Sequence, residues 1–274
     1  RSHGARGAAI ASGELHIDVA FLGASSADPL GNACGYSRSE NAKSICGSLG
    51  HALPDARYAD KVVVPTDDLV NYPNTPNSIS EHDVDFVVEV DSVGDSSKIA
   101  SGAIRDTKNP RDILLAKQAA KVIVNSGYFN DGFSIQTGSG GASLAAVKYI
   151  RQSMIDRNIQ ASFALGGITA HVVKMHEEGL IERLIDVQSF DKVAAESLKK
   201  DPRHKEVAAY EYASKQEQGS ATHYLDIVIL SALEVDVHFN VNVLVGSDGI
   251  IRGAIGGHPD TAEDSALSII VCPM

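Results

Sequence analysis

The sequence predicts an α/β fold, built on an open, largely parallel sheet with flanking helices. Short apolar segments of strand length recur along the chain, and segments with helical periodicity alternate with them. Glycine-rich turns join several of these strands to the helices that follow. This alternation is typical of parallel sheets, whose strands are connected by helices.

Each expected strand is a short apolar run, and each expected helix has a recognisable start, period or end. The strands are His16–Leu22, Lys61–Pro65, Val84–Val90, Val122–Val124, Phe133–Thr137, Ala161–Leu165 and Tyr224–Leu230. The helices open at Pro110, span Ala142–Ile150, run from His171 to a terminal glycine at Gly179, and lie around Asp191–Lys200.

The stretch 91–97 is rich in Asp, Ser and Gly and is the best candidate for a linker. We therefore expect residues 1–97 to form the end portion of a first α/β domain and residues 98–274 to form a second one. The chain begins at Arg1 rather than Met and stops just after an apolar strand. We expect it to be part of a longer polypeptide.

The most informative stretch runs from Leu233 to Val245, where every odd position is apolar. Period two predicts a strand with one face on the core. The opposite face carries two carboxylates, an imidazole and two carboxamides, namely Glu234, Asp236, His238, Asn240 and Asn242.

A hairpin turn is predicted at Asp248–Gly249, with Ile250–Ile255 as the return strand. The return ends in Gly256–Gly257, and Asp260 with Glu263 is typical of a helix N-terminus. Two glycines ahead of a helix expose backbone N–H groups, which form a general cradle for an anion or an oxyanion.

Composition excludes several function classes. The formal net charge of −11 and the absence of Trp argue against a nucleic-acid surface. Cys34, Cys46 and Cys272 fit neither a disulfide framework nor a zinc pattern, so reduced thiols in a cytoplasmic protein are the simpler interpretation. No apolar run reaches the ~18 residues of a membrane span, no signal peptide is present, and no metal motif occurs.

Two glycine pairs are candidate ligand loops. Gly138-Ser139-Gly140-Gly141 stands between a predicted strand and helix, an arrangement that holds phosphate on backbone amides. Ser143 occupies the place of the third glycine, and the next strand ends in Gly166–Gly167 rather than an acid, so a dinucleotide site is disfavoured. A packing role for these glycines remains an equal alternative.

Glu234 is the strongest catalytic candidate, because it lies near the end of a strongly apolar strand. Burial and repulsion from Asp236 would make it a stronger base or nucleophile. A structural acid paired with Arg or Lys is an equally good interpretation. His238 and His258 are more often structural than catalytic, and Arg1, His3 and Arg6 are more simply surface residues than ligands of an anion.

Two segments resemble paired motifs of the acyl-CoA transferase and hydrolase superfamily: 231–236 (SALEVD) and 253–260 (GAIGGHPD). Segment 131–140 (DGFSIQTGSG) is similar to a third motif. The resemblance implies a CoA-transferase-like fold in both domains. It also implies Glu234 as the nucleophile, with the later Gly–Gly loop helping to build the oxyanion hole and the CoA site.

The chain resembles the citrate lyase alpha chain family still more closely, over nearly its whole length. Segments that match in order are 13–20, 31–33, 46–50, 58–62, 239–243 and 246–253. This resemblance implies a citrate CoA-transferase that exchanges acetate for citrate on a carrier thioester. Its partners would be the acyl carrier protein (gamma) and lyase (beta) subunits, within a homo-oligomer. CoA or a CoA-derived arm would be substrate, and no cofactor would be bound by this chain.

On this basis we expect Glu234, Gly256 and Gly257 to be catalytic. The expected CoA and substrate contacts are Gly138, Ser139, Gly140, Gly141, Gly166, Gly167, Asn242 and His258. Two mechanisms stay open: Glu234 attacks the thioester, or citrate itself attacks in a ternary complex and Glu234 only positions it. A non-catalytic half that docks the carrier, and an acyl-CoA hydrolase or transferase using another acceptor, are the alternatives.

The predicted hairpin contains a geometric conflict. A straight strand turning at Asp248–Gly249 would set Gly256 opposite Val241, about 20 Å from Glu234 at the usual rise per residue. A shared site therefore requires the strand to break, and we predict the break around His238 to Asn240.

Overall fold

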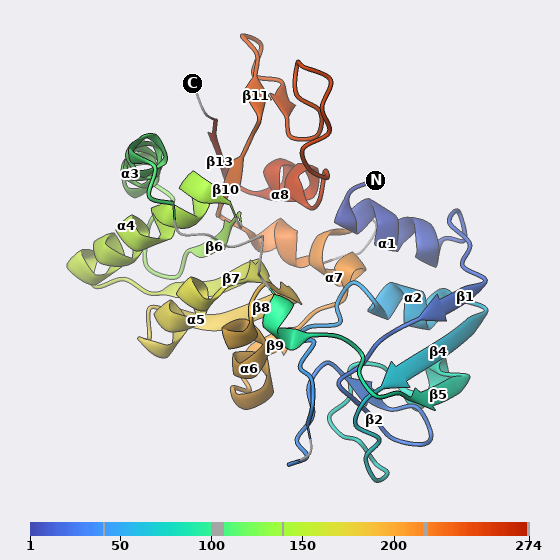
Figure 1. Cartoon of the computed structure of the whole chain (residues 1–274). Helices are drawn as coiled ribbons and strands as arrows, with labels where there is room; N and C mark the ends of the chain where they lie inside the picture. The colour runs from blue at the N-terminus through green and yellow to red at the C-terminus, as the bar shows by residue number, and fades with distance from the viewer. Residues whose placement is uncertain (41, 100–106, 139, 216–218, 273–274) are drawn as a thin grey trace.

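The computed structural model describes residues 1–40, 42–99, 107–138, 140–215 and 219–272 (Figure 1). Its centre is a six-stranded parallel sheet of strand order β13-β10-β6-β7-β8-β9. The strands are β6 (Ser134–Thr137), β7 (Ala161–Ile168), β8 (Ile181–Ser189), β9 (His204–Glu206), β10 (Ile227–Ser231) and β13 (Leu267–Val271). Every pairing in this sheet is parallel, which confirms the predicted fold class.

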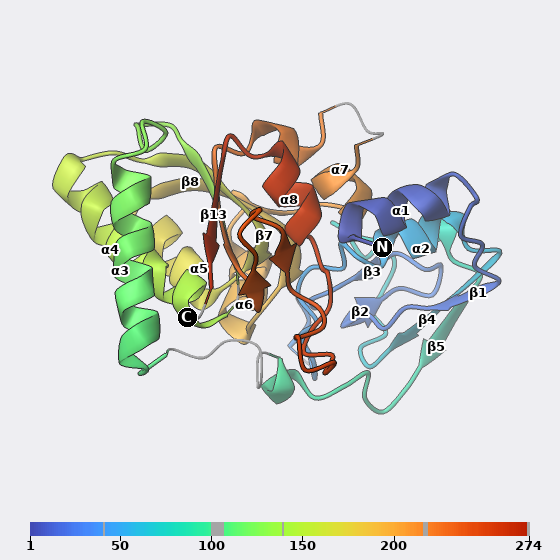
Figure 2. The same ribbon diagram turned by 90° about the horizontal axis from the view of Figure 1, so that it is seen from above.

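Helices cover both faces of this sheet (Figure 2). In β10, Ile227 and Ile229 pack into one core with the helices α3 and α4, whereas Val228 and Leu230 pack into another with α7. A strand buried on both faces is apolar throughout, which explains its continuous sequence pattern. The helices are α3 (Pro110–Val124), α4 (Gly141–Arg157), α5 (Ala170–Glu177), α6 (Lys192–Lys200), α7 (Ala209–Ala213) and α8 (His258–Asp264).

A smaller parallel sheet of order β1-β4-β5 lies beside the larger one (Figure 2). Its strands are β1 (Val19–Phe21), β4 (Lys61–Thr66) and β5 (Phe86–Glu89), with a separate apolar core that includes Val62, Val64 and Ile79. Helices α1 (His3–Ala11) and α2 (Leu53–Tyr58) lie between the two sheets, and α1 packs on α7. The structure also contains a short antiparallel ribbon, β2 (Ser26–Ala27) with β3 (Ala33–Cys34), and the 3-10 turns Glu81–Asp83, Ser96–Lys98 and Ala221–Tyr224.

The predicted strand at Val122–Val124 is wrong, because these residues form the last turn of α3. Ile123 is buried on the same helix face as Ala116, Ala119 and Ala120. Spacings of three, four and seven residues match the period of a helix, so the apolar triplet continues its buried stripe.

The single strand predicted from Leu233 to Val245 is also wrong. The segment is a hairpin in which β11 (Glu234–Val235) pairs antiparallel with β12 (Val241–Asn242). The chain reverses between them, with Phe239 at a φ of 64°. The predicted break around His238 to Asn240 is therefore confirmed.

The physical cause of this reversal is Asp236. Its Oδ1 accepts hydrogen bonds from the backbone amides of His238 (2.8 Å) and Asn240 (2.9 Å). An aspartate that bonds amides two and four residues ahead closes a turn. The turn leaves Val237 and Phe239 89% and 85% exposed, so the alternating pattern did not mark a core face.

The predicted turn at Asp248–Gly249 is present, with Gly249 at a φ of 78°. The return strand is not, since only Ile251 pairs with Val245, as an isolated bridge. Asp260 is not the N-cap of the last helix, because α8 already begins at His258 after Gly257. The Asp260 side chain instead accepts a hydrogen bond from Ser2, which lies near the opposite end of the sequence.

Candidate functional site

A cavity of about 200 Å³ lies where the strands of the large sheet end at their carboxyl termini. Ligands of open α/β sheets bind at this edge. We call it the histidine cavity. It is lined by His3, His51, Gln136, Thr137, Gly138, Gly167, Val187, Gln188, Phe190, Tyr212, Leu230, Gly256, Gly257 and His258.

Asp260 brings the start of α1 to this cavity. Its two carboxylate oxygens accept hydrogen bonds from Ser2 Oγ (2.5 Å) and from the Gly4 amide (3.0 Å). The His3 amide also donates to the Gly256 carbonyl (3.1 Å). Burial raises the pKa of Asp260, the hydrogen bond from Ser2 opposes that rise, and both oxygens are occupied by α1. His3 is thereby held against the Gly256–Gly257 loop.

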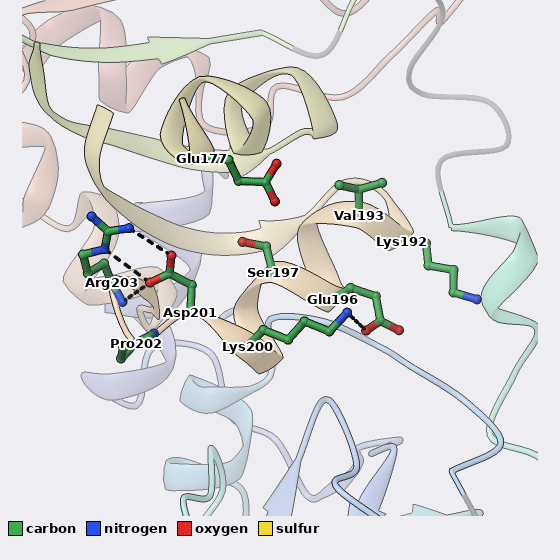
Figure 3. Close-up of a pocket in the computed structure, with 9 residues that line it drawn as sticks. All are labelled: Glu177, Lys192, Val193, Glu196, Ser197, Lys200, Asp201, Pro202 and Arg203. Atoms are coloured by element: carbon green, nitrogen blue, oxygen red, sulfur yellow. Dashed lines mark hydrogen bonds and ion pairs between the residues drawn. The ribbon is translucent and has the colours of Figure 1, made fainter. Parts of the chain in front are cut away.

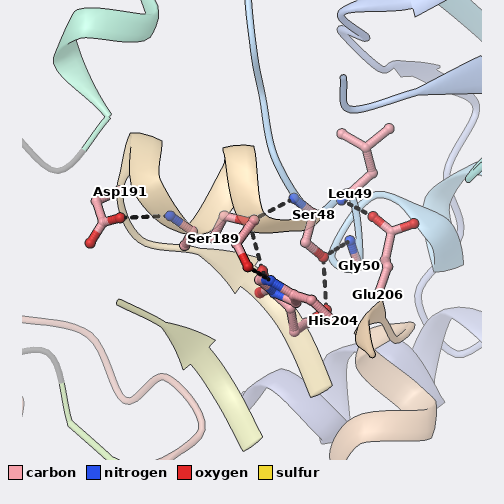
Figure 4. A network of polar contacts seen from close by, with 10 residues as sticks. Ser48, Leu49, Gly50, Ser189, Asp191, His204 and Glu206 are labelled. Atoms are coloured by element: carbon pink, nitrogen blue, oxygen red, sulfur yellow. Dashed lines mark hydrogen bonds and ion pairs between the residues drawn. The ribbon is translucent and has the colours of Figure 1, made fainter. Parts of the chain in front are cut away.

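A buried polar network holds the loop Gly47–Gly50 in place (Figure 4). His51 directly follows this loop in the sequence. In this network the Ser48 amide donates to Ser189 Oγ (3.0 Å), and Ser48 Oγ donates to the carbonyl of Asp186 (2.9 Å). The Leu49 amide donates to the carboxylate of Glu206. The loop is thus fastened to the ends of β8 and β9.

Beneath the loop, Asp186 is fully buried and accepts a hydrogen bond from Ser189 Oγ (2.6 Å). The same carboxylate oxygen lies 3.0 Å from Nε2 of the buried His204. Burial raises the pKa of Asp186, and the hydrogen bond from His204 opposes that rise. The network supports the cavity from below and does not line it.

Three glycines leave room for the cavity walls. A Cβ at Gly167 would lie 2.0 Å from the Phe190 ring, and one at Gly166 would lie 2.8 Å from the Gln136 carboxamide. A Cβ at Gly257 would lie 2.9 Å from the Tyr212 hydroxyl. Contacts under 3.0 Å are steric overlaps, so the glycines are required by packing around the cavity. Gln136 in turn donates to the Tyr212 hydroxyl (2.8 Å).

Burial favours the neutral form of two imidazoles in the cavity, those of His3 and His51. Burial lowers the pKa of His51 to about 4, with His3 and Arg6 contributing repulsion. Burial also lowers the pKa of His3, while Asp260 opposes that change. The rings of His3 and His51 meet edge to face with centroids 4.3 Å apart.

Glu234 does not line this cavity, although the chain breaks where we predicted. It lies on the β11–β12 hairpin, which extends at the top of Figure 1 above α8. Its Oε1 accepts hydrogen bonds from Ser247 Oγ (2.5 Å) and the Ser247 amide (2.7 Å), and its Oε2 accepts one from Asn242 Nδ2 (3.2 Å).

These bonds contradict the expectation that burial and repulsion from Asp236 make Glu234 a stronger base. The hydrogen bond from the Ser247 hydroxyl is the largest influence, and it lowers the pKa of Glu234. Asp236 turns away to cap its own reversal, and its pKa is lowered by Asn240. Glu234 is therefore a fixed, ionised carboxylate.

The other predicted residues lie partly in the histidine cavity, partly beside Glu234 and partly in neither place. Gly138, Gly167 and His258 join Gly256 and Gly257 in the histidine cavity, whereas Asn242 lies beside Glu234. Gly140 and Gly141 open α4, and the Gly138 amide is occupied by the carbonyl of Ile229 (2.8 Å). Gly166 lies behind Gln136, and Ser139 lies outside the described residues.

Sequence reasoning missed His51, Gln136 and Tyr212 and gave His3 little weight. Gln136 lies within the 131–140 motif but was not singled out there, His51 and Tyr212 lie in unremarkable segments, and these residues converge only in three dimensions. The glycine pair Gly166–Gly167 is the one sequence feature that hints at the cavity. Glycine at these positions leaves space for the side chains of Gln136 and Phe190.

A larger cavity of about 830 Å³ lies along α6 and the loop after it (Figure 3). Lys200 pairs with Glu196 (3.2 Å) and Arg203 with Asp201 (3.3 Å) on its wall. The adjoining cavity of about 510 Å³ adds Arg38, Lys199 and Lys205. This surface carries acids as well as cations, and Lys200 and Arg203 are paired with two of the acids.

Two further features concern other chemistries. The one group of possible metal ligands in the described ranges is His16, Asp18 and Asp60, all of them exposed. His16 forms an ion pair with Asp60 when protonated, which accounts for the grouping. Within the described residues, no helix combines the length and apolar character that a bilayer crossing requires.

Comparison with known proteins gives a consistent assignment. The family model described as "Citrate lyase, alpha subunit (CitF)" matches residues 1–274. The citrate lyase alpha chains of Escherichia coli and Haemophilus influenzae are each 56% identical over 273 residues, which is 100% of this chain and 53% and 54% of theirs. The chain therefore spans about half the length of the curated relatives it matches.

Solved structures agree in fold. A crystal structure described as the alpha subunit of citrate lyase from Streptococcus mutans, in complex with citrate, is 55% identical. It aligns with a TM-score of 0.93 over 98% of this chain and 52% of that chain. A 4-hydroxybutyrate CoA-transferase from Porphyromonas gingivalis, 15% identical, shares the fold with a TM-score of 0.56 over 98% of this chain and 66% of its own. The chain belongs to the citrate lyase alpha subunit family.

Proposed function

We propose that this chain is part of a citrate CoA-transferase, which exchanges acetate for citrate on a thioester carrier. One observation carries the proposal: the chain is 54–56% identical to citrate lyase alpha chains over its whole length. A relative solved in complex with citrate supports citrate as the acceptor. The carrier is CoA or a CoA-derived arm on an acyl carrier protein.

The geometry favours the ternary route. A carboxylate oxygen of citrate attacks the acetyl thioester carbonyl, and the carrier thiolate leaves, giving a mixed anhydride. The thiolate then attacks the citryl carbonyl of the anhydride, and acetate leaves. Amide groups of Gly256 and Gly257 are suited to the tetrahedral oxyanions, since in the part of the chain that the structure describes they donate to no backbone acceptor.

Glu234 acts as a positioning carboxylate in this scheme. Hydrogen bonds from Ser247 and Asn242 occupy it and lower its pKa, and both effects weaken a nucleophile. Its fixed negative charge holds in place Asn242 of the β11–β12 hairpin and Ser247 beside that hairpin. The carrier protein and a lyase subunit that cleaves the citryl thioester are the expected partners, in a homo-oligomeric complex.

The test is transfer from acetyl-CoA to citrate by the whole chain with Glu234→Gln. We expect transfer to fall at least about 100-fold while CoA binding is retained, because loss of one preorganised charge costs about 3 kcal/mol in the barrier. Glu14→Gln, an exposed acid paired with Arg1, is the matched control. Unchanged transfer in Glu234→Gln would remove the role given to this residue.

Borohydride reduction separates the two routes. After incubation with acetyl-CoA, a covalent route leaves a reducible thioester on Glu234, and mass spectrometry would detect it as the alcohol. The ternary route predicts no modified Glu234. Release of acetate without citrate consumption would instead identify a hydrolase.

A further inference from the structure

The histidine cavity contains a polar atom without a partner. Nε2 of His51 is buried and has no hydrogen bond among the described residues. A buried polar group left unpaired costs about 1–3 kcal/mol, and such groups are paired in most proteins. His51 lines a cavity of about 200 Å³, so the missing partner has room to bind.

Several groups that line the cavity can donate hydrogen bonds to a ligand. Tyr212 and Gln136 bond each other, and the nearby carboxylate of Asp260 is occupied by Ser2 and Gly4. The other polar groups that line the space are the imidazoles of His3, His51 and His258, the side chains of Thr137 and Gln188, and the backbone of the Gly256–Gly257 loop. A protonated imidazole, a hydroxyl, a carboxamide and free backbone amides can all donate to a carboxylate, whose oxygens only accept.

The volume of the cavity limits which anion it can hold. Pockets that take drug-sized ligands measure about 300–1,000 Å³, so a cavity of about 200 Å³ is too small for CoA. A single carboxylate with a short carbon skeleton fits it.

We propose that the histidine cavity is a carboxylate subsite, in which His51 binds the carboxylate through Nε2 and takes up a proton as it does so. The proposal rests on the proposed function, for which it supplies a place for the acceptor's carboxylate or the released acetate. It adds His51 and His3, which lie outside the glycine motifs, as binding residues.

Proton uptake follows from the charges around His51. Arg6 and His3 of α1 oppose its protonation, and Arg6 is itself paired with Asp55 of α2 (2.8 Å). From the other elements, Tyr212 of α7 is neutral because burial raises its pKa, and His258 of α8 adds no negative charge.

Asp260 of α8 is the acid on this side of the cavity, and its coulombic influence falls on His3. An anion beside His51 therefore supplies the negative charge that its own surroundings lack. Opposite charges within about 4–6 Å favour the ionised form of both groups.

Thermodynamic linkage between proton binding and carboxylate binding fixes the sign of the pH dependence of the affinity. If His51 is neutral when free and protonated when bound, the carboxylate binds more tightly as pH falls. One proton taken up corresponds to at most a tenfold gain in affinity per pH unit. We expect affinity for acetate to be about tenfold higher at pH 6 than at pH 8.

The experiment is isothermal titration of acetate, and separately of citrate, into the whole chain. Buffers of different ionisation enthalpy report the protons taken up. We expect uptake in the wild type, and in His51→Gln at least tenfold weaker binding with no uptake. His16→Gln is the control, since His16 is exposed and pairs with Asp60 (3.1 Å). Affinity independent of pH, or unchanged binding in His51→Gln, would overturn the proposal.

Two further measurements keep the outcome interpretable. The ring-proton NMR signal of His51 in the wild type should titrate with added acetate, and a signal that does not move would count against the subsite whether or not the variant folds. Glu234→Gln should bind acetate normally. Loss of transfer with intact acetate binding upholds both proposals, whereas intact transfer with intact binding removes only the role of Glu234.

Discussion

Removing the Asp186 carboxylate tests whether the buried network holds the loop that carries His51. In Asp186→Ala, Ser189 Oγ and His204 Nε2 lose a shared partner at 2.6 and 3.0 Å. Ser189 Oγ is also the acceptor for the Ser48 amide. The perturbation therefore removes one buried acid and loosens a second contact that fastens the loop.

The magnitude follows from burial and charge. Hydrogen bonds to charged groups contribute about 1.5–3 kcal/mol each, and breaking a buried pair costs about 3–5 kcal/mol. Desolvation of Asp186, which raises its pKa, offsets part of this gain. We expect the free energy of unfolding to fall by about 3 kcal/mol. At about 2–4 °C per kcal/mol, the melting temperature should fall by about 6–12 °C.

The assay is thermal and urea unfolding followed by circular dichroism, with a double-mutant cycle. Asp18→Ala is the control, because Asp18 has a side chain 90% exposed and should change stability by less than about 0.5 kcal/mol. His204→Ala combined with Asp186→Ala should cost at least about 1 kcal/mol less than the sum of the single changes. A loss below about 1 kcal/mol in Asp186→Ala, or strict additivity, would refute the reasoning.

Three other changes have defined outcomes. His51 has a folded pKa of about 4 against 6.5 unfolded, so the unfolded chain binds more protons between these values, and wild-type stability should fall by up to about 3 kcal/mol from pH 6.5 to 4. In urea unfolding, His51→Gln should lose this dependence, and a retained dependence would assign it to another group. Asp236→Ala should speed amide exchange at His238 at least several-fold, because the hydrogen bond from this amide is lost. The pKa of Asp236 is lowered in the folded chain, so in the wild type the protection of this amide should be full above the unfolded pKa of Asp236 and weaken as pH falls further. Gly167→Ala should lower the free energy of unfolding by about 1–3 kcal/mol, since its Cβ would overlap Phe190 at 2.0 Å; wild-type thermal stability would contradict that overlap.

The sequence by itself determined the parallel sheet. Strands such as β10 are apolar on both faces, and that pattern is local and needs no knowledge of the neighbours. The turn at Asp248–Gly249 is equally local, since glycine supplies the positive φ. The division at residue 97 stays a prediction.

The local sequence patterns predicted the wrong secondary structure where the same residues fit two different conformations. The apolar triplet ending at Val124 suits either a strand or the buried stripe of α3, and packing against its neighbours selected the helix. The alternation from Leu233 to Val245 suits a core strand. The Asp236 carboxylate instead accepts hydrogen bonds from the nearby amides of His238 and Asn240, and these bonds stabilise a reversal of the chain. Hydrogen bonds over two to four residues compete directly with the sheet pairing that a core strand would need.

The candidate site was decided mostly by tertiary structure. The motifs around Gly256 and Gly167 are legible in the sequence, because glycine marks positions without room for a side chain. His3 reaches the same cavity only because Asp260 binds Ser2 across 258 residues of chain, and His51 only because Ser48 binds Ser189. A contact between distant residues leaves no period or spacing in either segment, so only the folded chain shows that the imidazoles meet.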